Sequence, residues 1–279
     1  MKQLPDGNYI VAFIDPLMLR VHKRVKQAGD ICGVDSTGNV DRIDSKVFHF
    51  VCPSPAGSLP LATMITSSES EEILTEGFTL VKELLPSYAW YGRGSLGPKL
   101  FMTDDCSPEI NSLSKVWPVS ALLLCIFHVL QALWRWLWSS QHGVTLSERP
   151  HCLKLFRDLL YSETEEEFIQ KRQTLEEDPI INKNNTYKTH LINCYFSRID
   201  KWAIFVRREQ EMATHNMNTN NMTETTFKIF KEFLLHRHKC YNLGKGSFLN
   251  KHCKVLVSCS DMVAVKSCQK LSLAVISCH

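Results

Sequence analysis

Short apolar runs that end in polar turn residues dominate the chain between residues 31 and 67. The segments ICGVDST (31–37), VFHFVCP (47–53) and LATMITS (61–67) have the length of strands, and the connections between them are short and polar. Short strands joined in this way form antiparallel meanders. The pattern therefore predicts three antiparallel strands.

After residue 67, segments with helical spacing alternate with strand-like ones. Ser68 is suited to cap a helix, because Glu71 follows three residues later and an apolar face continues to Pro86. The further predicted elements are a strand over 99–105, a helix from Ser107, a strand over 119–127 and a helix from His128. This order indicates an α/β fold with a mixed sheet. Residues 142–212 lack β-branched runs and are predicted to be all-helical.

The composition is that of an ordinary globular protein. Hydrophobic residues make up 44% of the 279 residues and charged residues 22%, which excludes a disordered or fibrous protein. The formal net charge of +3 is too small to bind nucleic acid by overall charge, so such binding would need local basic surfaces. Two basic stretches, 19–27 and 235–246, are either solvated helix faces or contacts to a phosphate backbone.

The cysteines and the longest apolar stretch bear on the cellular setting. The 11 cysteines are odd in number, and they stand singly up to Cys240, which favours a reducing compartment over a disulfide framework. The apolar stretch 120–138 contains His128, Gln131 and Arg135, whose side chains are costly in hydrocarbon. We therefore expect a soluble protein without a membrane span.

Carboxylates stand at the ends of two predicted strands. Asp35 lies near the end of the first strand, and Asp104 with Asp105 ends the fourth. If these strands are parallel neighbours, the carboxylates meet in one cleft, where oxygen donors suit Mg²⁺. The alternative is that Asp35 forms an Asx turn and that Thr-Asp-Asp caps a helix. Spacing alone favours this structural alternative, and only a fold that brings the two strand ends together favours the metal site.

Two further motifs have a structural interpretation. The segment GRGSLG (92–97) matches the GxGxxG pattern, but a strand follows it instead of a helix, so we predict a turn and not a nucleotide site. Trp134 and Trp138 lie one helical turn apart and are predicted to be core residues, whereas Trp136 is predicted to be partly exposed.

Cys125 and His128 form a C-x-x-H spacing within the apolar stretch. A zinc half-site would need a second ligand pair, and the sequence offers none of suitable spacing before residue 236. A structural role for His128 at the end of the fifth strand is the alternative.

Four segments in order, VDSTG, FMTDD, the run from VWPVS to WRWLW, and NTNNMTE, resemble the catalytic domain of Mutator-like element (MULE) transposases. The resemblance covers roughly residues 10–240. It implies an RNase H-like α/β fold interrupted by an all-helical insertion before the last catalytic helix. The domains expected on this basis are an N-terminal helical flank (1–30), a core (31–141), the insertion (142–212), a catalytic helix (213–240) and an irregular Cys-containing tail (241–279).

The resemblance also implies a site. The Asp-Asp-Glu triad of the family falls on Asp35, Asp104 and Glu224, with Asp105 as an alternative second carboxylate and Cys125 and His128 in support. Two Mg²⁺ ions, for which Mn²⁺ can substitute, would bridge the triad and promote hydrolysis and transesterification of DNA phosphodiesters. Histidine or thiolate ligands would favour softer metals.

The implied function is DNA strand cleavage and strand transfer by a transposase. Its partners would be transposon ends and target DNA, the active form would be a homo-oligomer, and the location would be the nucleus. The zinc-binding modules common at the termini of family members are not visible in this sequence. Two alternatives therefore stay open: a non-catalytic descendant that binds DNA or proteins, and a metal-dependent nuclease acting on RNA or damaged DNA.

Overall fold

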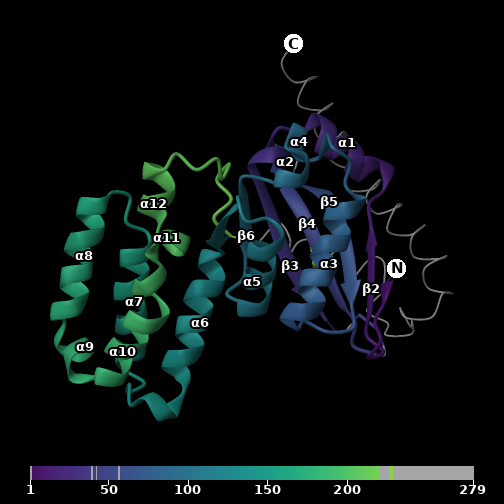
Figure 1. Cartoon of the computed structure of the whole chain (residues 1–279). Helices are drawn as coiled ribbons and strands as arrows, with labels where there is room; N and C mark the ends of the chain where they lie inside the picture. Colours follow the sequence, from purple (N-terminus) through teal and green to yellow (C-terminus); the bar gives the residue numbers. More distant parts are fainter. Residues whose placement is uncertain (1, 39, 42, 56, 220–225, 229–279) are drawn as a thin grey trace. The chain divides into compact units, whose positions relative to one another are not determined.

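The computed structural model describes residues 2–38, 40–41, 43–55, 57–219 and 226–228 (Figure 1). The chain divides into two compact units. We call Met1–Leu122 with His215–His279 the sheet unit, and Leu123–Thr214 the helical unit. The tail 241–279 and most of the predicted catalytic helix 213–240 lie outside the described residues, and so does Glu224.

A seven-stranded mixed sheet has the strand order β1-β2-β5-β4-β3-β6-β7. Its strands are β1 (Lys2–Gln3), β2 (Tyr9–Phe13), β3 (Ile31–Thr37), β4 (Lys46–Ser54), β5 (Gly57–Thr66), β6 (Leu100–Thr103) and β7 (Ala121–Leu124). The pairs β3/β4 and β4/β5 are antiparallel, as the meander predicts, whereas β3 and β6 run parallel. The predicted α/β class with a mixed sheet is therefore confirmed.

The helices with defined bounds in the described part of the sheet unit are α1 (Pro16–Arg24), α2 (Gln27–Asp30), α3 (Glu71–Leu84), α4 (Ala89–Gly92) and α5 (Ser107–Val116). The main core lies between the sheet and these helices, where the ring of Phe78 from α3 meets Phe48 and Phe50 edge-on. Most of β3 and β4 is buried on both faces. The sheet therefore contributes two inner faces, which explains why these strands are almost continuously apolar.

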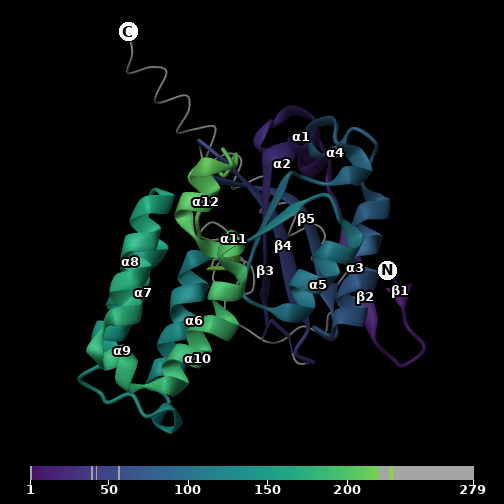
Figure 2. The same cartoon turned by 60° about the vertical axis from the view of Figure 1, so that its left-hand side comes forward.

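The helical unit begins with α6, and Figure 2 shows its helices from a second side. Its elements are α6 (Ile126–Trp138), α7 (Arg149–Leu160), α8 (Glu165–Glu177), α9 (Pro179–Lys183), α10 (Asn185–Cys194), α11 (Ile199–Trp202) and α12 (Ile204–Glu209). Phe156 is at its centre, with its ring 4.8 Å from that of Tyr195 and 5.3 Å from that of Trp202. The sequence places the start of the helical block at residue 142, whereas α6 already belongs to this unit.

The N-terminal flank differs from the prediction. Only residues 16–30 of the expected helical flank 1–30 contain helix, because β1 and β2 join the sheet instead. Pairs from Ile10↔Thr66 to Phe13↔Thr63 hold β2 on β5. The apolar YIVAF segment thus completes a sheet edge with a partner more than fifty residues away, which local spacing does not reveal.

Helix starts also shift by two residues. Ser70, not Ser68, caps α3, because its side chain accepts a hydrogen bond from the Ile73 amide. Further along, β7 covers only Ala121–Leu124 of the predicted strand 119–127, and α6 begins at Ile126 instead of His128. None of the described helices combines the length and the apolar character needed to cross a bilayer.

Candidate active site

The parallel pairing of β3 with β6 places the two predicted catalytic aspartates. Its register joins Ile31 to Leu100 and Gly33 to Met102. Continued by two residues, this register sets Asp35 level with Asp104, directly after the end of β6. Asp105 lies one residue further along the chain, past the level of Asp35 and outside β6. The register therefore favours Asp104 over Asp105 as the partner of Asp35.

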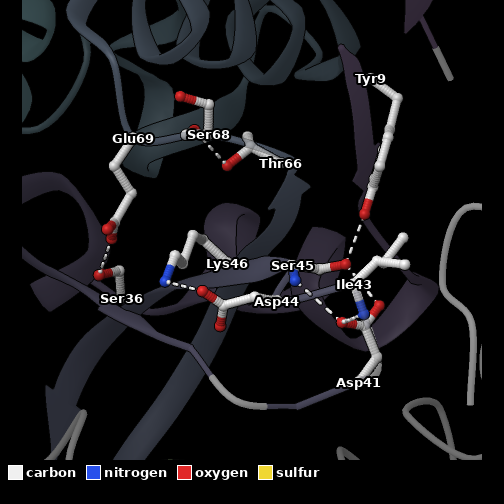
Figure 3. Close-up of polar contacts among 10 residues, drawn as sticks. All are labelled: Tyr9, Ser36, Asp41, Ile43, Asp44, Ser45, Lys46, Thr66, Ser68 and Glu69. Carbon is white, nitrogen blue, oxygen red and sulfur yellow. Dashed lines mark hydrogen bonds and ion pairs between the residues drawn. The ribbon is translucent and has the colours of Figure 1, made fainter. Parts of the chain in front are cut away.

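Asp35 is held by the chain that follows it. Its side chain is only 7% exposed, and its Oδ1 accepts a hydrogen bond of 2.7 Å from the Ser36 amide. The Ser36 hydroxyl in turn donates to Glu69 Oε1 at 2.7 Å, as Figure 3 shows. Glu69 lies in the turn between β5 and α3. A carboxylate that the sequence reasoning missed, that of Glu69, therefore contacts the residue that follows Asp35 in β3.

Negative charge also gathers around Cys106, at the beginning of α5. Burial is the main reason that the pKa of its thiol is raised, and the charges of Glu109, Glu69 and Asp104 add to the rise. Glu109 is itself buried, and it accepts a hydrogen bond from the Thr103 hydroxyl at the end of β6. Carboxylates from three separate segments thus share this end of the sheet with Asp35.

A polar row crosses the sheet beside Asp35. Register pairing sets His49 opposite Asp35 and Thr63 opposite His49, and the His49 Nδ1 lies 3.0 Å from the Thr63 hydroxyl. Burial lowers the pKa of His49 to about 4, so the imidazole is neutral at neutral pH. The ring therefore brings no positive charge to oppose a cation at Asp35.

The described part of the predicted catalytic helix lies over the same face. The ring of Phe227 is 5.0 Å from that of His49, and the hydroxyl of Thr226 is 3.2 Å from that of Ser58. These contacts bring the segment that follows Glu224 in the sequence to the register partner of Asp35.

The loop between β3 and β4 contains another buried acid, which serves the fold. Asp41 accepts hydrogen bonds from the amides of Ile43 and Ser45, and also from the Ser45 hydroxyl, which contacts Tyr9 (Figure 3). Lys46 pairs with Asp44 in the same loop. These bonds close the loop, so Asp41 has a structural role and is a poor candidate for a metal ligand.

Cys125 and His128 belong to the helical unit. Cys125 precedes α6, and its Sγ lies within 4.8 Å of a ring nitrogen of His128 in the first turn. The buried guanidinium of Arg207 donates to the Leu124 carbonyl at 2.6 Å and so fixes the start of this helix; its burial lowers its pKa to about 10. A thiol and an imidazole suit softer metals than Mg²⁺. This pair therefore gives no support to a magnesium site.

The glycine-rich segment is a turn, as predicted. It contains the end of α4 and a single 3₁₀ turn, Gly94–Leu96, and β6 follows. Gly97 has φ of +78°, and a Cβ there would lie 2.5 Å from Cδ1 of Trp117. The glycine at this position is required by backbone conformation and by packing, not by a nucleotide.

The tryptophans of α6 correct another prediction. Trp134 and Trp138 contact each other with ring centroids 4.5 Å apart, but Trp138 is 51% exposed and is not a core residue. Trp136 is partly exposed, as predicted, and its ring is stacked parallel to those of His142 and His190 at 4.0 and 4.2 Å. Because two imidazoles already stack on this indole, it is a poor candidate for a base-stacking platform.

No protein-family model matches the chain, and no curated protein matches it in sequence. Its function must therefore be inferred from its own residues.

Proposed function

We propose that this chain is a metal-dependent DNA-cleaving and strand-transferring enzyme of the MULE transposase type, built on an RNase H-like fold. The observation that supports the proposal is the parallel register of β3 and β6, which, continued by two residues, brings Asp35 level with Asp104. A metal site explains why two carboxylates lie at the same level on neighbouring strands. An Asx turn or a helix cap would not require this alignment.

The donor set fits Mg²⁺, with Mn²⁺ as a substitute. Asp35 and Asp104 offer hard oxygen ligands, Glu69 is linked to Asp35 through Ser36, and the imidazole of His49, the register partner of Asp35, is neutral. In the proposal Asp35, Asp104 and Glu224 hold two ions. The ions, when bound, activate a water or 3′-hydroxyl and stabilise the leaving oxygen of the phosphodiester.

The chain itself positions these ligands. The Ser36 amide orients one carboxylate oxygen of Asp35, and Glu69 orients Ser36. The pairing of Asp35 with His49 in the β3/β4 ladder holds its backbone in place. The proposed substrate is DNA, namely transposon ends and target, handled by a homo-oligomer in the nucleus. A cleft of this kind reads backbone, so sequence recognition is assigned to other surfaces.

The test is a nicking assay with the full chain. Supercoiled DNA with and without flanking terminal repeats is incubated with Mg²⁺, Mn²⁺ or EDTA. We expect nicking that depends on the metal. Asp35→Asn, Asp104→Asn and Glu224→Gln should each lower the nicking rate by more than about 100-fold, because mutating even the residues that only orient metal ligands lowers activity about 10–100-fold. Asp105→Asn is the matched control and should retain activity.

Two outcomes would overturn the proposal. Wild-type protein that nicks no DNA with either metal would leave the non-catalytic binding protein as the better reading. Nicking that survives Asp35→Asn would mean that the activity does not come from this site.

A further inference from the structure

A ridge of positive charge follows α1. Arg20, Lys23 and Arg24 recur at helical spacing on its outer side, and Lys26 follows directly after its end. All four are exposed, and no acidic residue interrupts the sequence between Asp15 and Asp30. Residues three and four apart share a helix face, so these cations point away from the core together.

These charges are not neutralised within the described part of the chain. Every ion pair found there involves other cations, and Lys23 contacts only the ring of Tyr88, at 5.5 Å from its centroid. A row of exposed cations without acidic neighbours produces a local positive potential, which attracts an anionic partner.

Exposed aromatic side chains lie beside the ridge. The Trp90 amide donates to Nδ1 of His22 at 3.2 Å, which ties α4 to the inner side of α1. The neighbouring Tyr88 is 38% exposed and Tyr91 is 50% exposed. Tyr91 lies close over Gly29, where a Cβ would come within 3.1 Å of it. The ridge therefore has flat rings along one border, a combination typical of surfaces that follow a nucleic-acid backbone.

We propose that this surface (Arg20, Lys23, Arg24 and Lys26, bordered by Tyr88 and Tyr91) binds the phosphate backbone of DNA. The proposal rests on the proposed function only for the choice of DNA as the polyanion. Figure 1 shows α1, α2 and α4 together at one end of the sheet. Because α2 leads directly into the start of β3, this is the opposite end from Asp35 and Asp104. It is thus a second DNA contact, separate from the acidic site.

An anionic membrane is a poorer partner for this ridge. Interfacial helices insert an apolar face into the lipid boundary. The apolar residues of α1, Met18 and Val21, are already buried in the sheet unit. The helix therefore has charge to offer a polyanion but no free apolar face to insert.

The experiment is a salt titration of binding to a fluorescent DNA duplex, in EDTA so that no cleavage occurs. The slope of log K against log salt concentration is about −0.9 for each phosphate neutralised. Lys23→Gln combined with Arg24→Gln should make the slope shallower by about 1.8, so that over a fourfold rise in salt the affinity falls about 12-fold less than in the wild type. Glutamine is a good helix former, and circular dichroism checks that the fold is retained.

A matched control changes the same charge elsewhere in the sheet unit. Lys2 pairs with Glu76 and Lys115 with Glu71, so Lys2→Gln combined with Lys115→Gln should leave the slope unchanged. Equal slopes in the wild type and in the Lys23→Gln/Arg24→Gln variant would overturn the proposal. It would also be overturned if this variant lost binding to phosphatidylserine vesicles but bound DNA as the wild type does. Asp35→Asn should keep the wild-type slope, which separates failure of this surface from failure of the catalytic site.

Discussion

His22 should make the sheet unit sensitive to mild acid. Its ring is fully buried, with Nε2 3.2 Å from the Leu61 carbonyl and Nδ1 3.2 Å from the Trp90 amide. A carbonyl can only accept and an amide N–H can only donate, so the bonds require a neutral ring with its proton on Nε2. Protonation of Nδ1 would place two donors against each other in the core.

The magnitude follows from the pKa. Burial lowers the pKa of His22 to about 4, against about 6.5 in an unfolded chain. The unfolded state therefore binds the proton more readily, and stability that is present above pH 6.5 is lost as the pH falls toward 4. Between pH 7 and pH 5 the loss is about 2 kcal/mol for this one group. His49, whose pKa is also lowered to about 4 by burial, should add a similar amount.

Urea unfolding of the wild type and of His22→Gln at pH 7 and pH 5 measures the contribution of His22 to the pH dependence of the free energy of unfolding. Glutamine does not titrate, so the wild type should lose about 2 kcal/mol more than the variant between the two pH values. His49→Gln is the matched control, because it should retain the His22 contribution and remove its own. An identical pH dependence in the wild type and His22→Gln would refute the reasoning.

Two substitutions test the local structure by the shift of the urea midpoint. Ser70→Ala should cost about 1 kcal/mol because it removes the cap of α3, whereas Ser68→Ala, at the cap expected from sequence, should cost less; the reverse order would contradict the assignment. Gly97→Ala should lower the free energy of unfolding more than Gly57→Ala. Both glycines have positive φ, which costs about 1–2 kcal/mol for alanine, but only at Gly97 would the new Cβ also clash with Trp117. Equal losses in the two variants would exclude that clash.

The order of elements could be predicted where the signal is local. The strands at 31–37 and 47–53 and the helix before Pro86 have apolar spacing that differs clearly from their connections, and the structure has β3, β4 and α3 there. The strand β2 could not be predicted in this way, because its five residues owe their conformation to pairing with β5. Trp138 shows the same limit. Helical spacing predicts its contact with Trp134, but it does not predict that the Trp138 side chain is exposed to solvent.

The candidate site divides along the same line. Asp35 and Asp104 could be found because each stands at a strand end, and their alignment required only that β3 and β6 be parallel neighbours. The choice between Asp104 and Asp105 needed the observed register. Glu69 gave no signal of its own, since its approach to Ser36 depends on the course of the turn before α3.

The small net charge of +3 conceals a separation that links the two proposals. At one end of β3 the carboxylates of Asp35, Glu69 and Asp104 would repel a phosphate backbone until divalent cations offset their charge. At the other end, the cations of α1 attract the same backbone without any metal. Binding of DNA to the α1 ridge would thus raise the local DNA concentration near the acidic site. That site would accept the DNA only after it has bound metal. The basic surface and the acidic site are therefore physically complementary parts of one proposed activity, and neither could replace the other.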